Sequence, residues 1–172
     1  MNVATIMAKD LILRPLELSD ATLICSKIYT FENTKYMLFK KPETVEKTLS
    51  NIEKAIKEYK KKNPKFIEFA VTMNNVIMGL ITLYRDKKDS YEICWIIDPL
   101  YANRGLMHKA CNSVIDYAKK SDVKRITAHA DIKNVSSITL MEKLGMKRNP
   151  IISERKYASG EKSFEVMYEL EF

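Results

Sequence analysis

The residues whose types and spacing could support chemistry lie where a predicted strand, Tyr91–Ile97, leads into a predicted helix at Gly105. A helix N-terminus presents unpaired N–H groups and a partial positive charge, and it therefore binds anions such as phosphate. Gly105 lacks the Cβ that would obstruct a phosphate, and Arg104 can add a charge-assisted hydrogen bond. His108, in the first turn, could help to hold the anion or simply lie at the surface. The pattern indicates an anion site, although one glycine before a helix is also typical of an ordinary turn.

The second histidine and the cysteines are weaker candidates. His129, near the end of a predicted strand, is either a base or a hydrogen-bonded structural residue. The three cysteines are too few and too irregularly spaced for a disulfide framework or a zinc site, and no Cys-x-x-Cys pair occurs. Cys94 and Cys111 fall on apolar patterns, which indicates small core residues rather than nucleophiles. We therefore predict no metal site and no covalent cysteine intermediate.

Length and composition bound the class of protein. The chain has 172 residues, of which 46% are hydrophobic, and these values predict one domain with a substantial core, which we place at residues 8–172. No stretch reaches the roughly 18 apolar residues of a membrane-spanning helix, and the start of the chain lacks the pattern of a secretory signal. Together with the few cysteines, these features favour a cytoplasmic protein that is not bound to a membrane.

The formal net charge of +7 raises the question of a polyanionic partner. The basic residues form no stripe interleaved with aromatic residues, and the densest run, 57–65, lies at the predicted end of a helix, where cations complement the helix dipole. We therefore expect no stable nucleic-acid binding. A small polyanionic molecule suits this charge at least as well.

Hydrophobic periodicity predicts the elements in the first part of the chain. Residues 11–16 predict a strand, and a helix follows with Ser19 or Asp20 as its cap. A second helix starts near Pro42 and ends before Pro64, because apolar residues recur between them at spacings of three and four. These elements precede the segment that carries the candidate chemistry.

Beyond the second helix, the pattern changes to three antiparallel strands and then to alternating strands and helices. Asn74-Asn75 can adopt the positive φ of a tight hairpin turn, and Gly145 can end the last helix in the left-handed conformation. The pattern predicts strands at 66–72, 76–84 and 91–97, a helix at 105–120, a strand at 125–130, a helix at 134–144, and one or two strands around Ser159-Gly160. This order predicts an α/β fold with one mixed, mostly antiparallel sheet.

Four segments in this order carry a resemblance to a known family. They are LILRPLELSDA (11–21), YEICWII (91–97), YANRGLMHKA (101–110) and NVSSITLMEKLGM (134–146). The chain resembles the GNAT (general N-acetyltransferase) superfamily over nearly its whole length, and within it the branch that acetylates the N-termini of ribosomal proteins. The resemblance implies a single-domain acyl-CoA N-acyltransferase fold with a splayed parallel strand pair and flanking helices, and acetyl-CoA as the acetyl donor.

In such a family, the pyrophosphate of coenzyme A lies against the amides of a Q/R-x-x-G-x-G/A loop, which matches residues 102–107 here. Only Gly105 is of the residue type that the pattern expects. The bulk of Met107 is expected to affect how tightly the cofactor binds and not which cofactor binds. Asn134 would contact the pantetheine arm, although Asn is also a favoured helix N-cap. The cofactor-binding residues that the resemblance implies are Trp95, Ile96, Ile97, Asn103, Arg104, Gly105, Leu106, Met107, His108, Asn134 and Ser137.

Acetyl transfer from a thioester to an amine needs a neutral nucleophile, a polarised carbonyl and a proton for the departing thiolate. A carboxylate is the expected group to take the proton from the amine. Glu92 is the first candidate for this base, acting directly or through water, because strand alternation places it with Cys94 and Ile96, opposite Trp95. A glutamate near a strand edge is also often only a solvated residue.

The proton for the thiolate needs a different group. Many members of the superfamily supply it from a tyrosine on the last helix, but here that position is Met141, which cannot donate a proton. Ser137 matches the Asn-x-x-Ser pattern of the ribosomal branch and is the candidate acid, although a serine at a helix N-terminus often bonds only to the backbone. Tyr157 is a reserve donor.

The predicted function is transfer of an acetyl group from acetyl-CoA to a primary amine by direct attack. The resemblance implies a protein N-terminus as the acceptor, and a small amine stays an alternative because related folds modify several kinds of amine. Residues 29–42, with Phe31, Tyr36 and Phe39, and the hairpin at 151–163 are expected to form the walls of the acceptor cleft. A homodimer is one possible assembly.

Two other classes of function stay open at the level of the sequence. A non-catalytic acyl-CoA sensor is favoured by the departures from the family pattern at Ala102, Met107 and Met141. A basic nucleic-acid binder would require affinity that falls steeply with salt.

Overall fold

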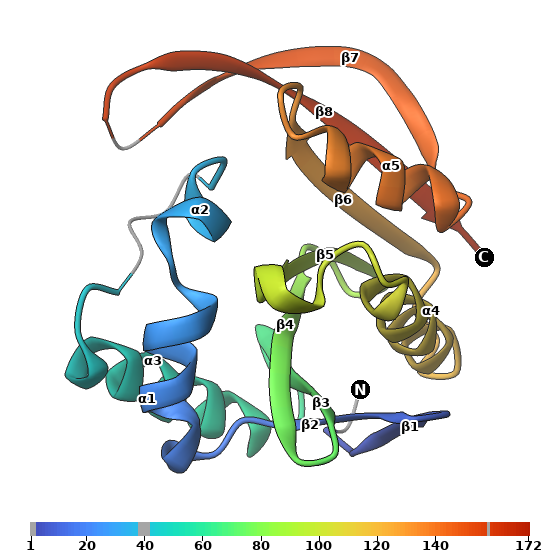
Figure 1. Ribbon diagram of the computed structural model, residues 1–172. Helices are drawn as coiled ribbons and strands as arrows, with labels where there is room; N and C mark the ends of the chain where they lie inside the picture. The colour runs from blue at the N-terminus through green and yellow to red at the C-terminus, as the bar shows by residue number, and fades with distance from the viewer. Residues whose placement is uncertain (1–2, 38–41, 158) are drawn as a thin grey trace.

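One sheet of eight strands organises the chain, in the order β1-β2-β3-β4-β5-β6-β8-β7 (Figure 1). The computed structural model describes residues 3–37, 42–157 and 159–172. All neighbouring strands are antiparallel except β5 and β6. The strands are β1 (Ile6–Ala8), β2 (Leu11–Pro15), β3 (Phe66–Met73), β4 (Val76–Arg85), β5 (Ser90–Ile97), β6 (Arg125–Asp131), β7 (Lys147–Lys156) and β8 (Lys162–Glu171).

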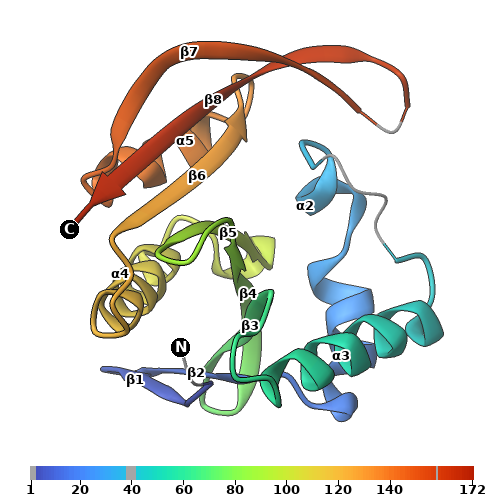
Figure 2. The ribbon, with the colours of Figure 1, turned by 180° about the vertical axis from the view of Figure 1, so that it is seen from behind.

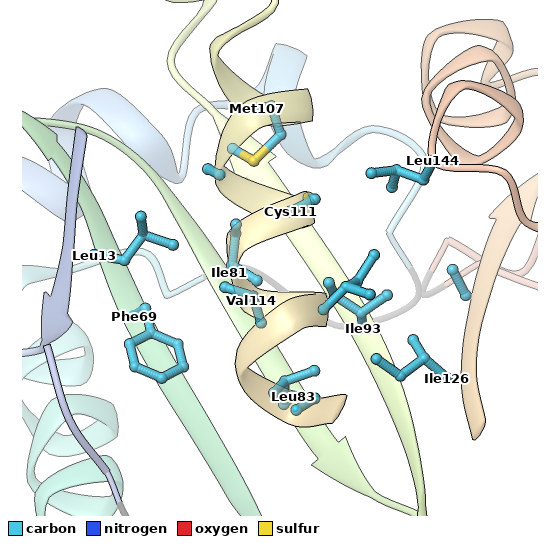
Figure 3. Packing of buried hydrophobic residues seen from close by; sticks show 14 of the residues in the cluster. Leu13, Phe69, Ile81, Leu83, Ile93, Met107, Cys111, Val114, Ile126 and Leu144 are labelled. Atoms are coloured by element: carbon cyan, nitrogen blue, oxygen red, sulfur yellow. The ribbon is translucent and has the colours of Figure 1, made fainter. Parts of the chain in front are cut away.

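Helices cover both faces of this sheet. They are η1 (Leu18–Asp20), α1 (Ala21–Leu23), η2 (Ile24–Ile28), α2 (Phe31–Thr34), α3 (Val45–Tyr59), η3 (Pro99–Tyr101), α4 (Leu106–Lys119) and α5 (Val135–Lys143). Buried residues of α4 and α5 join Phe69 and Ile93 in the larger core cluster (Figure 3). On the opposite face, Ile52 of α3 packs with Leu80 and Ile96 in a second cluster. None of the helices in the described ranges is long and apolar enough to cross a membrane.

The strands predicted from residue 11 to residue 130 are found within one residue of their expected bounds, and so are α4 and α5. The α/β fold class, with one mixed sheet, is therefore confirmed. Several elements differ from their prediction, and the short helices α2 and η3 were not predicted. The short strand β1, which pairs only with β2, was not predicted. The helix α3 starts at Val45 rather than near Pro42, because the side chain of Thr44 caps it by accepting a hydrogen bond from the N–H of Lys47 (3.3 Å).

The predicted cap of the first helix is only partly right. Asp20 precedes α1, but its side chain makes no capping bond to that helix. Instead, its carboxylate accepts a hydrogen bond from the N–H of Glu17 (2.8 Å) and two from the guanidinium of Arg14 (2.8 Å each). The helical stretch therefore begins three residues earlier, with the 3₁₀ turn at Leu18.

The parallel pair β5 and β6 holds together over a short distance and then separates. Only three residue pairs join the two strands, from Ser90 with Arg125 to Glu92 with Thr127. Beyond Glu92, β5 stays paired with β4, and β6 stays paired with β8. Figures 1 and 2 show the resulting divergence, with β6, β7 and β8 leaving the rest of the sheet. The edge of β5 that faces this gap has no strand partner among the described residues beyond Glu92.

Gly79 of β4 sets how closely β5 and α4 approach. A Cβ on Gly79 would lie 2.4 Å from the carbonyl oxygen of Ile96 and 3.0 Å from the Cε of Met107. The side chain of Met107 is 6% exposed and lies in the larger core cluster (Figure 3). Much of the bulk that distinguishes Met107 from the family pattern is therefore accommodated by packing beside a residue that has no side chain.

We expect Gly79→Ala to lower the free energy of unfolding by about 1–3 kcal/mol, because the added methyl group meets a backbone oxygen that cannot move by a change of rotamer. Chemical denaturation measures this loss. Val76→Ala is the control on the same strand, since Val76 is exposed and its truncation should change stability by less than about 0.5 kcal/mol. Equal stability of Gly79→Ala and the wild-type protein would contradict the close packing described here.

Candidate active site

A groove of about 660 Å³ runs from the loop before α4 to the first turns of α5. The residues predicted to bind the cofactor line this groove with one exception, Arg104. The lining set is Trp95, Ile96 and Ile97 from β5, Asn103 to His108 without Arg104 from the loop and α4, and Asn134 and Ser137 from the start of α5. Segments that are far apart in the sequence are thus brought together at the gap between β5 and β6.

The start of α4 has the properties of an anion site. Gly105 is its N-cap, with φ of 72°, and no side chain caps the helix. Asn103 also has a positive φ, of 60°, so the chain turns sharply twice before the helix begins. The first N–H groups of α4 are therefore left for a ligand, and the helix dipole favours a negative one. A Cβ on Gly105 would contact nothing within 4 Å, so space is open above these amides.

Of the two side chains near this anion site, Arg104 and His108, only His108 lines the groove. The guanidinium of Arg104 lies 5.8 Å from the centre of the Tyr101 ring and does not line the groove, so its contact with phosphate stays a prediction. His108 lines the groove, with its Nε2 3.2 Å from the carbonyl oxygen of Lys143 and 3.1 Å from Nδ2 of Asn112. The histidine thus links α4 to the end of α5 at the groove wall.

Asn134 and Ser137 lie together at the N-terminus of α5. The Oδ1 of Asn134 accepts hydrogen bonds from the N–H of Ser137 (3.2 Å) and from the hydroxyl of Ser136 (2.9 Å), so Asn134 is an N-cap. The cap uses only this oxygen, and Nδ2 makes no hydrogen bond to another described residue. The Oγ of Ser137 likewise bonds to none of the described residues, although the side chain is partly buried. Both groups are available to a ligand in the groove.

A second cavity, of about 370 Å³, continues the groove toward β7 and β8. Glu92, Ile93, Cys94 and Trp95 of β5 line it, so residues of both faces of the strand border this cavity. The thiol of Cys94 donates a hydrogen bond to a carboxylate oxygen of Glu92 (3.5 Å). Burial, followed by the charge of Glu92, raises the pKa of Cys94 well above its usual value. Cys94 is therefore a neutral thiol beside the candidate base and not a nucleophile, as the sequence indicated.

Five residues line both cavities and so mark their junction: Tyr36, Met37, Trp95, Asn134 and Ser137. If the groove holds the cofactor from its phosphates inward, the reactive end of the cofactor reaches this junction. Glu92 lies on one side of the junction and Ser137 at it, so the two predicted catalytic residues face the same space. Trp95 packs against the core and is also part of both cavity walls, rather than only a core residue.

The far wall of the second cavity contains charged residues that the sequence did not single out. Arg155 of β7 and Glu165 of β8 line it beside Asp131, and Arg155 lies 3.9 Å from Asp131 and 3.6 Å from Glu165. The Nδ1 of His129 is 3.3 Å from Glu165. No motif in the sequence connects these residues, because they meet only through the pairing of β6, β7 and β8.

Asp131 is the buried centre of this cluster. Burial alone would raise the pKa of Asp131, but hydrogen bonds from the hydroxyl of Tyr157 and from the N–H of Lys133 (2.8 Å) lower it below its usual value. The reserve donor Tyr157 is thus bonded to Asp131 and does not line the cavity that contains Glu92. Of the acceptor walls predicted from the sequence, Tyr36 and the hairpin residue Arg155 are found there, and Phe39 lies outside the described residues. The prediction for Phe31 is wrong, because its side chain is exposed and lines neither cavity.

Glu68 of β3 adds a further carboxylate to the sheet face that carries Cys94. The strand registers place Glu68 opposite Thr82, and Thr82 opposite Cys94. The hydroxyl of Thr82 donates a hydrogen bond to Glu68 (3.2 Å), and no ion pair to Glu68 occurs among the described residues. Burial, only partly offset by the hydrogen bond from Thr82, raises the pKa of Glu68 to about 7.

The splayed parallel strands and the uncapped helix N-terminus fit an acyl-CoA ligand, and a carboxylate and a hydroxyl line the cavity beside this groove. The chain belongs to the GNAT acetyltransferase family, since the family described as acetyltransferase (GNAT) domain matches residues 10–147. The protein is therefore an acetyltransferase, and acetyl-CoA is its acetyl donor. The uncapped amides of α4 and the free groups on Asn134 and Ser137 fit this molecule.

Known proteins support this assignment at the level of family and fold. The uncharacterized N-acetyltransferase YnaD of Bacillus subtilis (strain 168) is 26% identical over 145 residues, which are 83% of this chain and 82% of YnaD. An acetyltransferase (GNAT family) from Bacillus anthracis has a TM-score of 0.86 at 25% identity, with 98% of each chain covered. The ribosomal L7/L12 α-N-protein acetyltransferase RimL, solved with coenzyme A, has a TM-score of 0.85 at 15% identity, again with 98% of each chain covered.

We expect Gly105→Ala to weaken the binding of acetyl-CoA by about tenfold, because the methyl group enters the space above the α4 amides. Isothermal titration calorimetry measures the affinity. Gly145→Ala is a matched control: Gly145 also has a positive φ, of 76°, with nothing within 4 Å of its Cβ position, but it lies past the end of α5. Both variants should lose about 1 kcal/mol of stability from backbone strain, and equal affinities for acetyl-CoA would contradict the anion site.

The raised pKa of Glu68 has a consequence for stability. Because the folded protein keeps the proton up to about pH 7 and the unfolded chain loses it near the ordinary value of 4.5, stability should fall as the pH rises through this range. We expect Glu68→Gln to remove this fall and to be more stable than the wild-type protein at pH 8 by about 2 kcal/mol. Denaturation at pH 5 and pH 8 measures both values. Parallel pH dependences of the variant and the wild-type protein would contradict the burial of Glu68.

Proposed function

We propose that this acetyltransferase transfers the acetyl group of acetyl-CoA to a primary amine by direct attack in a ternary complex. The observation that carries the proposal is the junction of the two cavities. Ser137 lines both cavities, and Glu92 lines the second one. One cavity suits the donor, because it ends at the uncapped helix α4. The other suits a cationic acceptor, because Glu92, Glu165 and Asp131 outnumber Arg155 in its wall.

Glu92, in the second cavity, and Ser137, at the junction, perform separate proton transfers. Glu92 accepts a proton from the ammonium group of the acceptor, directly or through water, so that the nitrogen can attack the thioester carbonyl. The C–N bond forms, and the C–S bond breaks as the tetrahedral intermediate collapses. Ser137 donates a proton to the departing thiolate and takes one from the nitrogen of the new amide. The products are an N-acetylated amine and coenzyme A, and Glu92 releases its proton to water.

The acceptor is a protein N-terminus or a small amine. The fold shared with RimL is compatible with the first, and the volume of the second cavity, about 370 Å³, is compatible with either. Three departures from the family pattern favoured a non-catalytic sensor, and packing explains two of them. Met107 and Met141 are both buried in the larger core cluster, so neither needs a lost catalytic role to account for it.

We expect Glu92→Gln to lower kcat by about 10²–10³-fold and Ser137→Ala to lower it by about 10–10²-fold, because each variant removes one proton transfer. Thiol release from acetyl-CoA with a panel of amines measures the rates. Binding of acetyl-CoA by Glu92→Gln should match that of the wild-type protein, since Glu92 does not line the donor groove.

Two exposed positions provide controls for these variants. Glu154→Gln removes a surface carboxylate that pairs with Lys162, and Ser113→Ala removes a hydroxyl that bonds only to the backbone of α4. Both should retain the wild-type rate. Tight binding of acetyl-CoA without thiol release for any amine would favour the sensor and contradict the proposal.

A further inference from the structure

The guanidinium of Arg155 is buried in the wall of the second cavity but uses few of its hydrogen-bond donors. Its side chain is 7% exposed. Its one hydrogen bond to a described residue runs from Nη2 to the carbonyl oxygen of Tyr36 (3.0 Å), although a guanidinium has five N–H donors. The Nε atom is buried and has no hydrogen-bond partner among the described residues. The Nε atom has almost no accessible surface, so the donors left for the oxygen of a ligand are those of the terminal Nη atoms, of which Nη1 makes no hydrogen bond to a described residue.

The carboxylates beside Arg155 balance its charge without satisfying its donors. Asp131 is 3.9 Å from Nε and Glu165 is 3.6 Å from Nη1, which are distances for ion pairs and not for hydrogen bonds. The oxygens of Asp131 are already engaged by Lys133 and Tyr157. Two carboxylates therefore share one guanidinium, and the group of three has a net negative charge.

We propose that Arg155 donates a hydrogen bond to a neutral amide carbonyl next to the reacting amine, so that it selects the N-terminal residue of a peptide as the acceptor. This inference rests on the proposed acetyl transfer to an amine. Glu92 and Arg155 line the same cavity from β5 and β7, so the amine and the carbonyl of one acceptor can reach them together.

The surrounding charge favours a carbonyl over a carboxylate as the group that Arg155 binds. The carboxylate of a free amino acid would be a third anion beside Asp131 and Glu165, with only one guanidinium to compensate them. A neutral carbonyl oxygen avoids this repulsion and still accepts the unused N–H donors. The acceptor class that fits is therefore an α-amino amide, the chemical form of a peptide N-terminus, and not a free amino acid.

Three small acceptors test this inference: alaninamide, alanine and 2-aminobutane, which have the same branched amine but differ in their oxygen groups. We expect Arg155→Gln to lower kcat/KM for alaninamide about tenfold more than for 2-aminobutane, mainly through KM, because only alaninamide loses a hydrogen bond. The variant is compared with the wild-type protein for each amine separately, so the different basicities of the amines cancel. For the wild-type protein, alanine should be a poorer acceptor than alaninamide when the rates are expressed per unprotonated amine.

The controls separate recognition from a structural effect, since Arg155 also ties β7 to the segment after α2. Lys156→Gln removes the next positive charge on the same strand, from an exposed position, and should leave the ratio between the acceptors unchanged. Arg155→Lys keeps the charge and should give an intermediate ratio, and it serves as the test if Arg155→Gln does not fold. Calorimetry with acetyl-CoA should give the wild-type affinity for both Arg155 variants.

Two results would overturn the inference, and they are distinguishable. Turnover with the same loss of kcat/KM for all three amines would contradict the role of Arg155 and leave the acetyl transfer intact. Thiol release from the wild-type protein with none of these amines and with none of a panel of peptides would contradict the proposed function together with this inference.

Discussion

The three residue pairs that join β5 to β6 are the constraint on which the active site depends. Had the two strands stayed in register to their ends, the backbone of β5 beyond Glu92 would be satisfied by β6 and no gap would exist. Their divergence leaves polar backbone groups beside an opening, and ligands of open α/β sheets bind at such openings at the carboxyl ends of strands. The divergence also directs β5 toward the start of α4 and β6 toward the start of α5, so both helix N-termini face the opening.

The fold could be predicted from local sequence patterns because each pattern reflects a local physical preference. Alternation in 91–97 and the spacing of apolar residues in 106–119 reflect which face of an element is buried, and both predicted their elements within one residue. The misses depend on particular contacts that hydrophobic periodicity does not report. The start of the first helical stretch depends on a carboxylate shared between Arg14 and a backbone N–H, and β1 is held in place only by its pairing with β2.

The two halves of the site also differ in how far the sequence predicts them. The donor half could be placed from the sequence, since the glycine before α4 and the N-cap of α5 are signals carried by adjacent residues. The walls of the acceptor half could be predicted only as segments, 29–42 and the hairpin at 151–163. Its charged residues could not be singled out, because Arg155 reaches Tyr36 across 119 positions of the chain and meets Glu165 only through strand pairing. The inward packing of Met107 was equally invisible, since it depends on a glycine 28 positions earlier, on another strand.

The β7–β8 hairpin extends toward α2 in both views (Figures 1 and 2). Because of this position, the donor half and the acceptor half of the site are formed by different segments of the chain. Most of the donor groove comes from one continuous stretch, 95–143, with a contribution from residues 32–37. The far wall of the acceptor cavity comes from β6, β7 and β8, and a hydrogen bond from Arg155 to the carbonyl oxygen of Tyr36 links this wall to the segment after α2. Changes in β7 and β8 can therefore reshape what the enzyme modifies while its energy-rich thioester is held as before, so selectivity and chemistry can diverge independently in this architecture.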